Sequence, residues 1–297
     1  MAEQISAKLV KELRDITGAG MMECKKALTE TEGDIKKAVD FLRTRGLAAL
    51  DKKAHRATNE GAIAEYITLD DKVGALIEVN CETDFVASNE VFTSFVKLLA
   101  EMVATYNPTD VDELKFMSVP HRDITVGDLF GEIVGKLGEN IKIARFTRTE
   151  IVGTGALAAY IHGGAKIGIM VEFRLGDQAA AEKEVFKIYA RDIAMQVAAA
   201  NPIAVRREDF DPALVEHEKD IYKAQAAESG KPEAIQEKMA TGRLNKFFKE
   251  QALVEQAFVK DMDISVDEYT KRVAKELATE VEIVNYLRYD LGSSAAS

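Results

Sequence analysis

The chain has 297 residues, of which 47% are hydrophobic and 30% charged, a composition typical of a globular protein with about two domains. A net charge of −11 disfavours a general nucleic-acid binder, and two distant cysteines, Cys24 and Cys81, exclude a disulfide framework and a zinc ribbon. No signal peptide is visible, and no apolar stretch approaches the roughly 18 residues that a membrane helix needs. We therefore expect a soluble protein of the cytoplasm.

Three short amphipathic helices are predicted in residues 1–54, which are called the head below. The head is mildly basic, whereas the rest of the chain is acidic. Ser6 can cap the first helix, and the sequence TGAG at 17–20 ends it, because two glycines permit a sharp turn. Apolar residues recur at helical spacing in all three segments. In the first helix they are Leu9, Val10, Leu13 and Ile16. Three such helices are typical of a small binding domain of the ubiquitin-associated type, followed by a polar linker at 51–61.

A methionine pair, Met21 and Met22, follows this turn directly. Methionine is flexible and polarizable, so it serves equally well in a core and on an adaptable contact surface. The sequence leaves both possibilities open.

Residues 61–108 and 155–202 form an internal repeat. They align without a gap at an offset of 94, with about a third of the positions identical, where unrelated sequences give about one in sixteen. Each copy has the pattern strand, turn, strand, loop, helix, and segments near 141–151 and 281–289 can complete the two sheets. The pattern predicts an α+β core of two duplicated subdomains, each an antiparallel sheet with a helix, at 55–140 and 141–290.

The second subdomain contains a highly charged insert at about 212–250. Its apolar residues are sparse, and the sequence SGKPE at 229–233 divides it into two helical segments. The insert is therefore predicted to be a protruding helical hairpin. The last residues, 291–297, are predicted to be a disordered tail.

The two copies differ most informatively at one loop. Residues 83–86, with the sequence TDFV, stand opposite DQAA at 177–180. An aromatic residue beside a carboxylate is unusual in a solvated loop. Either Phe85 folds back onto its own helix as a hydrophobic staple, or Asp84 and Phe85 protrude to contact another protein. His162, opposite Thr68 in the repeat, is similarly either a solvated turn residue or an interface contact.

Signatures of enzymes are absent from the sequence. It contains no GxxxxGK[ST], HExxH or GxSxG motif, and its four histidines stand singly, without metal-ligand spacing. A loose GxGxxA pattern at 153–158 precedes a predicted strand, whereas a dinucleotide site needs a helix there. We expect no catalytic residue, no metal and no cofactor. The alternatives are an adaptor that binds through its head alone and an enzyme with an unrecognised cleft between the repeats.

Four segments together resemble the bacterial elongation factor Ts family. They are TGAGMMECKKAL in the head, EVNCETDFV after the second core strand, YIHGGAKIG in the second copy and SGKP in the hairpin, in the family's order. The resemblance spans residues 1 to about 290. It implies a three-helix head, a core of two related subdomains and a hairpin that can mediate dimerisation. It also implies guanine-nucleotide exchange on the GTPase elongation factor Tu, without direct contact to nucleic acid or membrane.

The resemblance also implies which residues contact the partner. Residues 83–86, namely Thr83, Asp84, Phe85 and Val86, match the loop that enters the GTPase domain near its magnesium site. Further matches to contact positions are Leu13, Met21 and Met22 in the head and His162 in the second repeat. One difference from the family is that Leu291 leads directly into GSSAAS, where many members continue with another helix.

Overall fold

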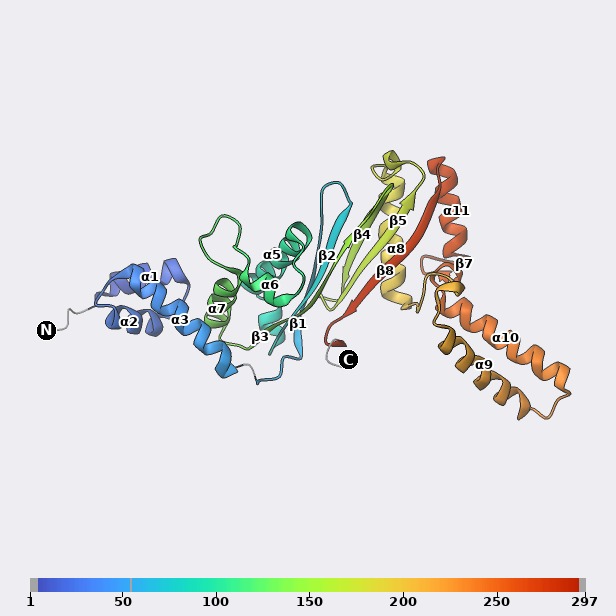
Figure 1. Cartoon of the computed structure of the whole chain (residues 1–297), viewed down its shortest axis with the longest axis horizontal. Coiled ribbons are helices and arrows are strands. Elements are labelled where there is room, and N and C mark those ends of the chain that lie inside the picture. Colours follow the sequence, from blue (N-terminus) through green and yellow to red (C-terminus); the bar gives the residue numbers. More distant parts are fainter. Residues whose placement is uncertain (1–4, 54, 294–297) are drawn as a thin grey trace.

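The computed structural model describes residues 5–53 and 55–293, and the side chains of all of these except 46–53. The molecule is elongated, with helices α1 to α3 at one end, the hairpin of α9 and α10 at the other, and two β-sheets between them (Figure 1). The predicted mixture of helices and antiparallel sheets is confirmed. Within the described residues, the helices are too short or too polar to cross a membrane.

The head consists of α1 (Ala7–Thr17), α2 (Met21–Glu30) and α3 (Ile35–Lys53). The backbone N–H of Leu9 donates to Ser6 Oγ at 3.2 Å, which caps α1. Gly18 ends α1 with φ +66°, a conformation that glycine adopts without strain. The head has a small core of its own, formed by Val10, Leu13, Cys24, Ala27, Leu28 and Ala38. Two details of the prediction were wrong. Ile16 is largely exposed, and α3 extends into the predicted linker.

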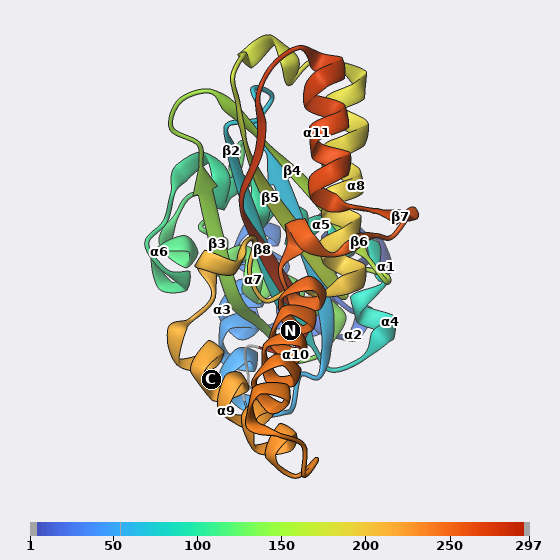
Figure 2. The ribbon, with the colours of Figure 1, turned by 90° about the vertical axis from the view of Figure 1, so that its right-hand side faces the viewer.

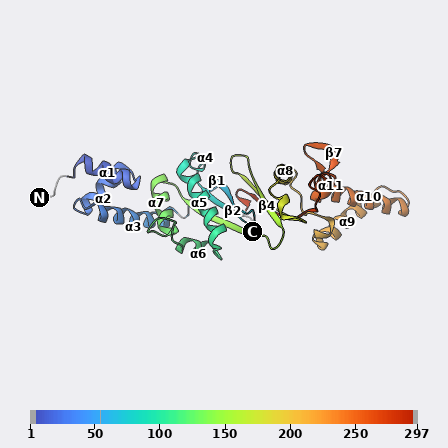
Figure 3. The same cartoon turned by 90° about the horizontal axis from the view of Figure 1, so that it is seen from above.

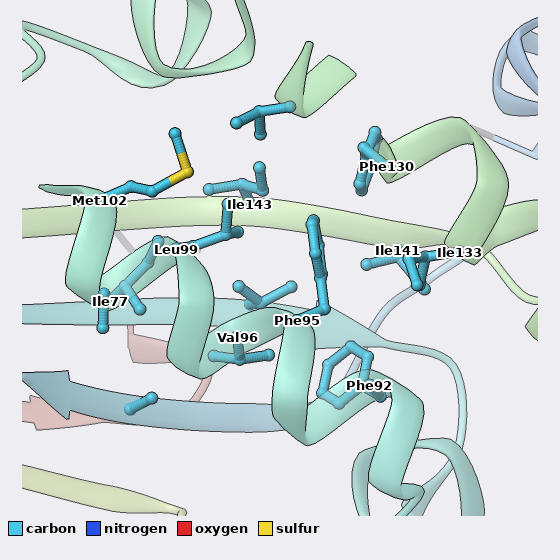
Figure 4. Packing of buried hydrophobic residues seen from close by; sticks show 14 of the residues in the cluster. Ile77, Phe92, Phe95, Val96, Leu99, Met102, Phe130, Ile133, Ile141 and Ile143 are labelled. Carbon is cyan, nitrogen blue, oxygen red and sulfur yellow. The ribbon is translucent and has the colours of Figure 1, made fainter. Parts of the chain in front are cut away.

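The first sheet has the order β1-β2-β3, with antiparallel pairing throughout. Its strands are β1 (Glu60–Ile67), β2 (Val73–Cys81) and β3 (Ile141–Glu150), and the helices of this half are α4 (Asp84–Ala87), α5 (Glu90–Tyr106), α6 (Val111–Phe116) and α7 (Val126–Leu137). Side chains of α5, such as Phe92, Phe95 and Leu99, pack against the sheet (Figure 4). Because β3 pairs with β2, the subdomain boundary predicted at residue 141 was wrong, and β3 belongs to the first sheet.

The second sheet has the equivalent order β4-β5-β8. Its strands are β4 (Gly155–His162), β5 (Ile167–Leu175) and β8 (Val281–Asp290), accompanied by α8 (Glu184–Ala200), the small hairpin β6 (Ala257–Phe258) and β7 (Asp261–Ser265), and α11 (Val266–Leu277). Short 3₁₀ turns occur at η1 (Gln178–Ala180), η2 (Arg207–Asp209) and η3 (Leu253–Glu255). Phe173 of β5 and Tyr189 of α8 meet edge to face in this core, 5.6 Å apart.

The two sheets pack on each other with approximate twofold symmetry. Ile63 and Leu157 are equivalent residues of the repeat, and both lie in the hydrophobic cluster between the sheets. The N–H of Ile63 donates to the carbonyl of Ala165, and the N–H of Leu157 donates to the carbonyl of Asp71, each at 2.8 Å. The donors and the acceptors of these two hydrogen bonds are both related by the offset of 94. Each copy therefore contacts the other through the same positions of the repeat.

The repeat extends further than the sequence comparison indicated. Helices α7 and α11 both begin with capping boxes, one formed by Thr125 and Asp128 and the other by Ser265 and Glu268. Their offset is 140 rather than 94, so the second copy carries 46 additional residues. That insertion contains the predicted hairpin, formed by α9 (Pro212–Ala227) and α10 (Glu233–Gln251).

The residues after β8 contact the first sheet. The N–H of Gly292 donates to the buried carboxylate of Glu78 at 2.8 Å, and Arg145 Nη2 donates to Ser293 Oγ at 2.8 Å. The predicted disordered tail was therefore wrong for residues 291–293. Residues 294–297 lie outside the described part of the chain.

Candidate protein-interaction site

Residues 83–86 form a short helical turn, called the Phe85 turn below. Thr83 is its N-cap, because Thr83 Oγ1 accepts a hydrogen bond from the N–H of Val86 at 3.3 Å. Val86 is buried in the core of the first repeat. Asp84 and Phe85 lie between these anchors and point outward, with the Phe85 side chain 83% exposed. This exposure excludes the alternative in which Phe85 folds back as a staple.

Polar contacts hold the turn against the rest of the first repeat. Thr83 Oγ1 donates to Glu139 Oε1 at 2.6 Å, and Cys81 Sγ donates to the Thr83 carbonyl at 3.2 Å. Burial, together with the nearby Glu139 carboxylate, raises the pKa of the Cys81 thiol to about 12, so this thiol stays protonated and can donate. Sequence analysis did not single out Glu139. An isolated carboxylate before a strand carries no motif that could have revealed it.

The corresponding turn of the second copy is directed differently. Asp177 caps it, by accepting from the N–H of Ala179 at 3.0 Å, but Ala179 stands in the place of Phe85. Gln178, the equivalent of Asp84, donates to the carbonyl of Gly155 at 3.0 Å and accepts from Lys72 Nζ at 2.5 Å. The second turn therefore joins the two copies, whereas the first presents an aromatic side chain to solvent.

A groove of about 1050 Å³ lies beside the Phe85 turn, along strand β1. Ala87, the last residue of α4, lines it on one side, and Ile161 of β4 and Gly164 of the β4–β5 turn line it on another. His162 is adjacent to Ile161, is exposed, and shares a hydrogen bond of 2.9 Å between its Nδ1 and Tyr160 Oη. Residues 162–166 are called the His162 turn below. The fold thus brings two sequence-predicted segments from different repeats, the Phe85 turn and the His162 turn, to the sides of one groove.

The predicted contact residues of the head divide into two kinds. Met21 and Met22 are 55% and 74% exposed, so both lie on the surface rather than in the core. Ile16, on the other side of the 17–20 turn, belongs to the predicted apolar stripe of the first helix, but it is 58% exposed and adds apolar surface. Leu13 is fully buried in the head. Its predicted role as a partner contact is not supported by this position, because the side chain offers no surface.

The head and the Phe85 turn lie apart along the molecule but on the same side of it. Two perpendicular views place α1 and α4 along one long edge, with α6 and α9 on the opposite edge (Figures 2 and 3). A partner on that edge could therefore contact the head and the Phe85 turn together. Among the described residues, no three His, Cys, Asp or Glu side chains are grouped so that they could hold a metal ion.

Comparisons with known proteins agree on one family. The sequence model described as Elongation factor TS matches residues 82–293. The chain is 45% identical to Elongation factor Ts of Clostridium kluyveri over 97% of its own length and 93% of that protein. It is 46% identical to Elongation factor Ts of Clostridium perfringens and 45% identical to that of Clostridium botulinum, with the same coverage of both chains. The chain belongs to the elongation factor Ts family.

Proposed function

We propose that this protein is a guanine-nucleotide exchange factor that binds elongation factor Tu in its GDP form. In this proposal it disturbs the magnesium and phosphate site of the GTPase and promotes GDP release during translation elongation. The observation that carries the proposal is Phe85, an 83% exposed aromatic side chain on a turn anchored at both ends, in a chain of this family.

The mechanism follows from thermodynamic linkage. A GTPase holds GDP through backbone amides of its phosphate loop, a lysine and a magnesium ion that demands near-octahedral geometry. Displacing the elements that carry these groups weakens the nucleotide site. A protein that binds the displaced form better must weaken nucleotide binding by the same factor by which nucleotide weakens its own binding.

Phe85 can supply a substantial part of the required free energy. Complete burial of a phenylalanine side chain contributes about 2–3 kcal/mol, which shifts a two-state population by up to about a hundredfold. Its turn is already ordered by Thr83 and Val86, so little entropy is lost when the ring is buried in a partner. A full population switch needs about ten-thousandfold, so Met21, Met22 and the His162 turn must contribute as well.

Asp84 has a separate role in this proposal. Its exposed carboxylate would be brought close to the cation site of the GTPase with the neighbouring ring. There it would compete for the hydrogen-bond donors that hold the phosphates and the metal-bound water. Since this contact is made only in the displaced form, it would favour that form.

The proposal is tested by Phe85→Ala, with Phe116→Ala as the matched control. Phe116 is 81% exposed but lies on α6, on the opposite edge of the molecule (Figure 3). Release of fluorescent GDP from elongation factor Tu is followed by stopped flow, with the chain at sub-stoichiometric and saturating concentrations. We expect Phe85→Ala to slow release at saturation by about thirty- to a hundredfold, and Phe116→Ala to match wild type. Equal release rates for wild type and Phe85→Ala would refute the proposed role of the ring.

We further propose the following boundaries and roles for the parts of the chain. Residues 1–54 form a three-helix, ubiquitin-associated-like binding domain, and the core consists of two duplicated subdomains that meet at about residue 151. The helical hairpin within 212–250 can mediate a homodimer. In this proposal the protein acts in the cytoplasm on a GTPase, catalyses no reaction of its own, and contacts neither nucleic acid nor membrane.

A further inference from the structure

We infer that Glu139 is a positioning residue for nucleotide exchange, because it fixes the Phe85 turn and connects it to the helix on which the head rests. The inference depends on the proposed exchange function. It assigns a role to a residue that is not itself expected to touch the partner.

The carboxylate of Glu139 accepts three hydrogen bonds from the start of the Phe85 turn. Glu139 Oε2 accepts from the N–H of Glu82 at 3.1 Å and from the N–H of Thr83 at 3.0 Å. Glu139 Oε1 accepts from Thr83 Oγ1 at 2.6 Å. Hydrogen bonds to an ionised acceptor are about twice as strong as neutral ones, so these contacts fix the residue that caps the turn.

The connection is reciprocal. The N–H of Asn140 donates to Glu82 Oε1 at 2.5 Å, and Asn140 Nδ2 donates to the carbonyl of Arg56 at 2.8 Å. Residues 82–83 and 139–140 are therefore joined by hydrogen bonds in both directions. Such a pair of segments resists sliding and rotation better than a single contact does, so the backbone from which the Phe85 side chain projects is held in place.

The second copy has no equivalent carboxylate at this position. At the offset of 140 that relates α7 to α11, Thr279 takes the place of Glu139. Gly176 takes the place of Glu82, and its N–H donates to the backbone carbonyl of Glu280 at 3.0 Å. The fold can thus complete this junction through the backbone alone. The copy whose turn presents an aromatic ring uses a carboxylate to hold the start of that turn, and the other copy does not. The Glu139 contacts are therefore not required by the fold that both copies share.

Helix α7 connects the same junction to the head. It ends at Gly138, in the left-handed conformation, so Glu139 follows the helix directly. On α7 itself, Asp128 and Glu132 form ion pairs with Arg43 of α3, at 3.5 and 3.7 Å. One helix thereby contacts the head along its length and the Phe85 turn at its end. The two proposed contact surfaces are held at a fixed separation, which lowers the ordering cost of binding both at once.

The test is Glu139→Gln, with Glu113→Gln as the matched control. The amide keeps the size of the side chain but removes its charge. Its remaining oxygen can still accept from the two N–H donors, only as a weaker neutral acceptor, whereas its NH₂ group cannot accept from Thr83 Oγ1. Glu113 makes a comparable contact elsewhere, since its Oε2 accepts from the N–H and Oγ1 of Thr109, both at 2.6 Å. We expect Glu139→Gln to lower the GDP release rate at saturation about tenfold, with the concentration for half-maximal effect changed less than about threefold. Glu113→Gln should behave as wild type.

Two further measurements separate positioning from a merely structural role. In a Phe85→Ala background, Glu139→Gln should slow release by less than about twofold further, because it acts through the ring. Amide hydrogen exchange of residues 82–87, measured without partner, should become at least about tenfold faster in Glu139→Gln. Thr83→Val, which removes one of the three hydrogen bonds together with the N-cap bond to Val86, is the second variant if Glu139→Gln folds poorly, and it should likewise slow GDP release and speed the exchange of these amides.

The outcomes distinguish this inference from the proposed function. If the wild-type chain fails to accelerate GDP release, the proposed function fails, while the exchange of amides 82–87 still reports on the junction. If the wild type is active and Glu139→Gln matches it, the inference is overturned and the proposed function stands. Additive effects of Glu139→Gln and Phe85→Ala would also overturn it.

Discussion

Gly168 lies at the interface between the two sheets, and its surroundings allow a quantitative prediction of stability. This residue lies on β5 and faces β1 across the interface. A Cβ atom at Gly168 would lie 2.4 Å from Ile63 Cγ2, and Ile63 is only 2% exposed. Carbon atoms prefer separations of about 3.5–4 Å, so Gly168→Ala would force the sheets or the Ile63 side chain to move by about 1 Å.

The cost follows from what is known of overpacked cores. Inserting a methyl group into a filled interior destabilises by about 1–3 kcal/mol, and the short distance at Gly168 suggests about 2 kcal/mol. Gly242 is the matched control, because it lies inside α10 and a Cβ atom added there would have no neighbouring atom within 4 Å. Gly242→Ala should instead stabilise by about 0.5–1 kcal/mol, since alanine favours the helix.

Urea unfolding followed by circular dichroism would measure both changes. Second substitutions at Ile63 sharpen the test, because Ile63→Ala removes Cγ2 whereas Ile63→Val retains it. Gly168→Ala should therefore cost much less in the Ile63→Ala background, by at least about 1 kcal/mol, and remain costly in the Ile63→Val background. A loss below about 0.5 kcal/mol for Gly168→Ala alone, or equal costs in all three backgrounds, would refute the packing argument.

Two other predictions concern Cys81 and the peripheral domains. Because burial raises the pKa of Cys81 from 9.0 to about 12, its contribution to stability is complete below pH 9 and is lost as the pH rises toward 12. Alkylation of Cys81 by iodoacetamide at pH 8.5 should be about a hundredfold slower in the folded than in the unfolded chain, and equal rates would contradict this. Chains lacking 1–54 or 212–250 should keep the circular dichroism of a folded core. Deleting 1–54 should weaken binding to elongation factor Tu, and an unchanged affinity would contradict the role of the head. Deleting 212–250 should abolish a dimer seen by light scattering, and an unchanged mass would contradict the role of the hairpin. A molten core in either deletion would contradict the domain boundaries.

Most of the architecture could be predicted because the chain repeats itself. The alignment at an offset of 94 indicated β1 and β2, β4 and β5, and the helices α5 and α8, since apolar periodicity and duplication supported the same elements. Helices α7 and α11 were missed because the 46-residue insertion changes the offset to 140 between them. Their similarity lies mainly in capping boxes and buried faces, which a gapless comparison cannot detect.

The candidate site was only partly predictable. The divergence at 83–86 identified this turn as distinctive but left open whether Phe85 folds back or protrudes, and the structure shows the ring exposed. Leu13 was placed on the contact surface by resemblance, but its position on the helical stripe favoured burial, and it is buried. Glu139 could not be found, because its significance depends on a contact with residues more than 50 positions earlier in the chain.

The contacts between the two sheets show why the first turn is free to face outward. In the second copy, Gln178 accepts from Lys72 and so helps to hold the two sheets together. The equivalent lysine on the other side, Lys166, instead pairs with Glu60 at 3.0 Å. That contact ties the β4–β5 turn to β1 without using Asp84, which remains exposed. The contacts between the sheets thus do not use Asp84, and an outward aromatic ring on the first turn does not interrupt them.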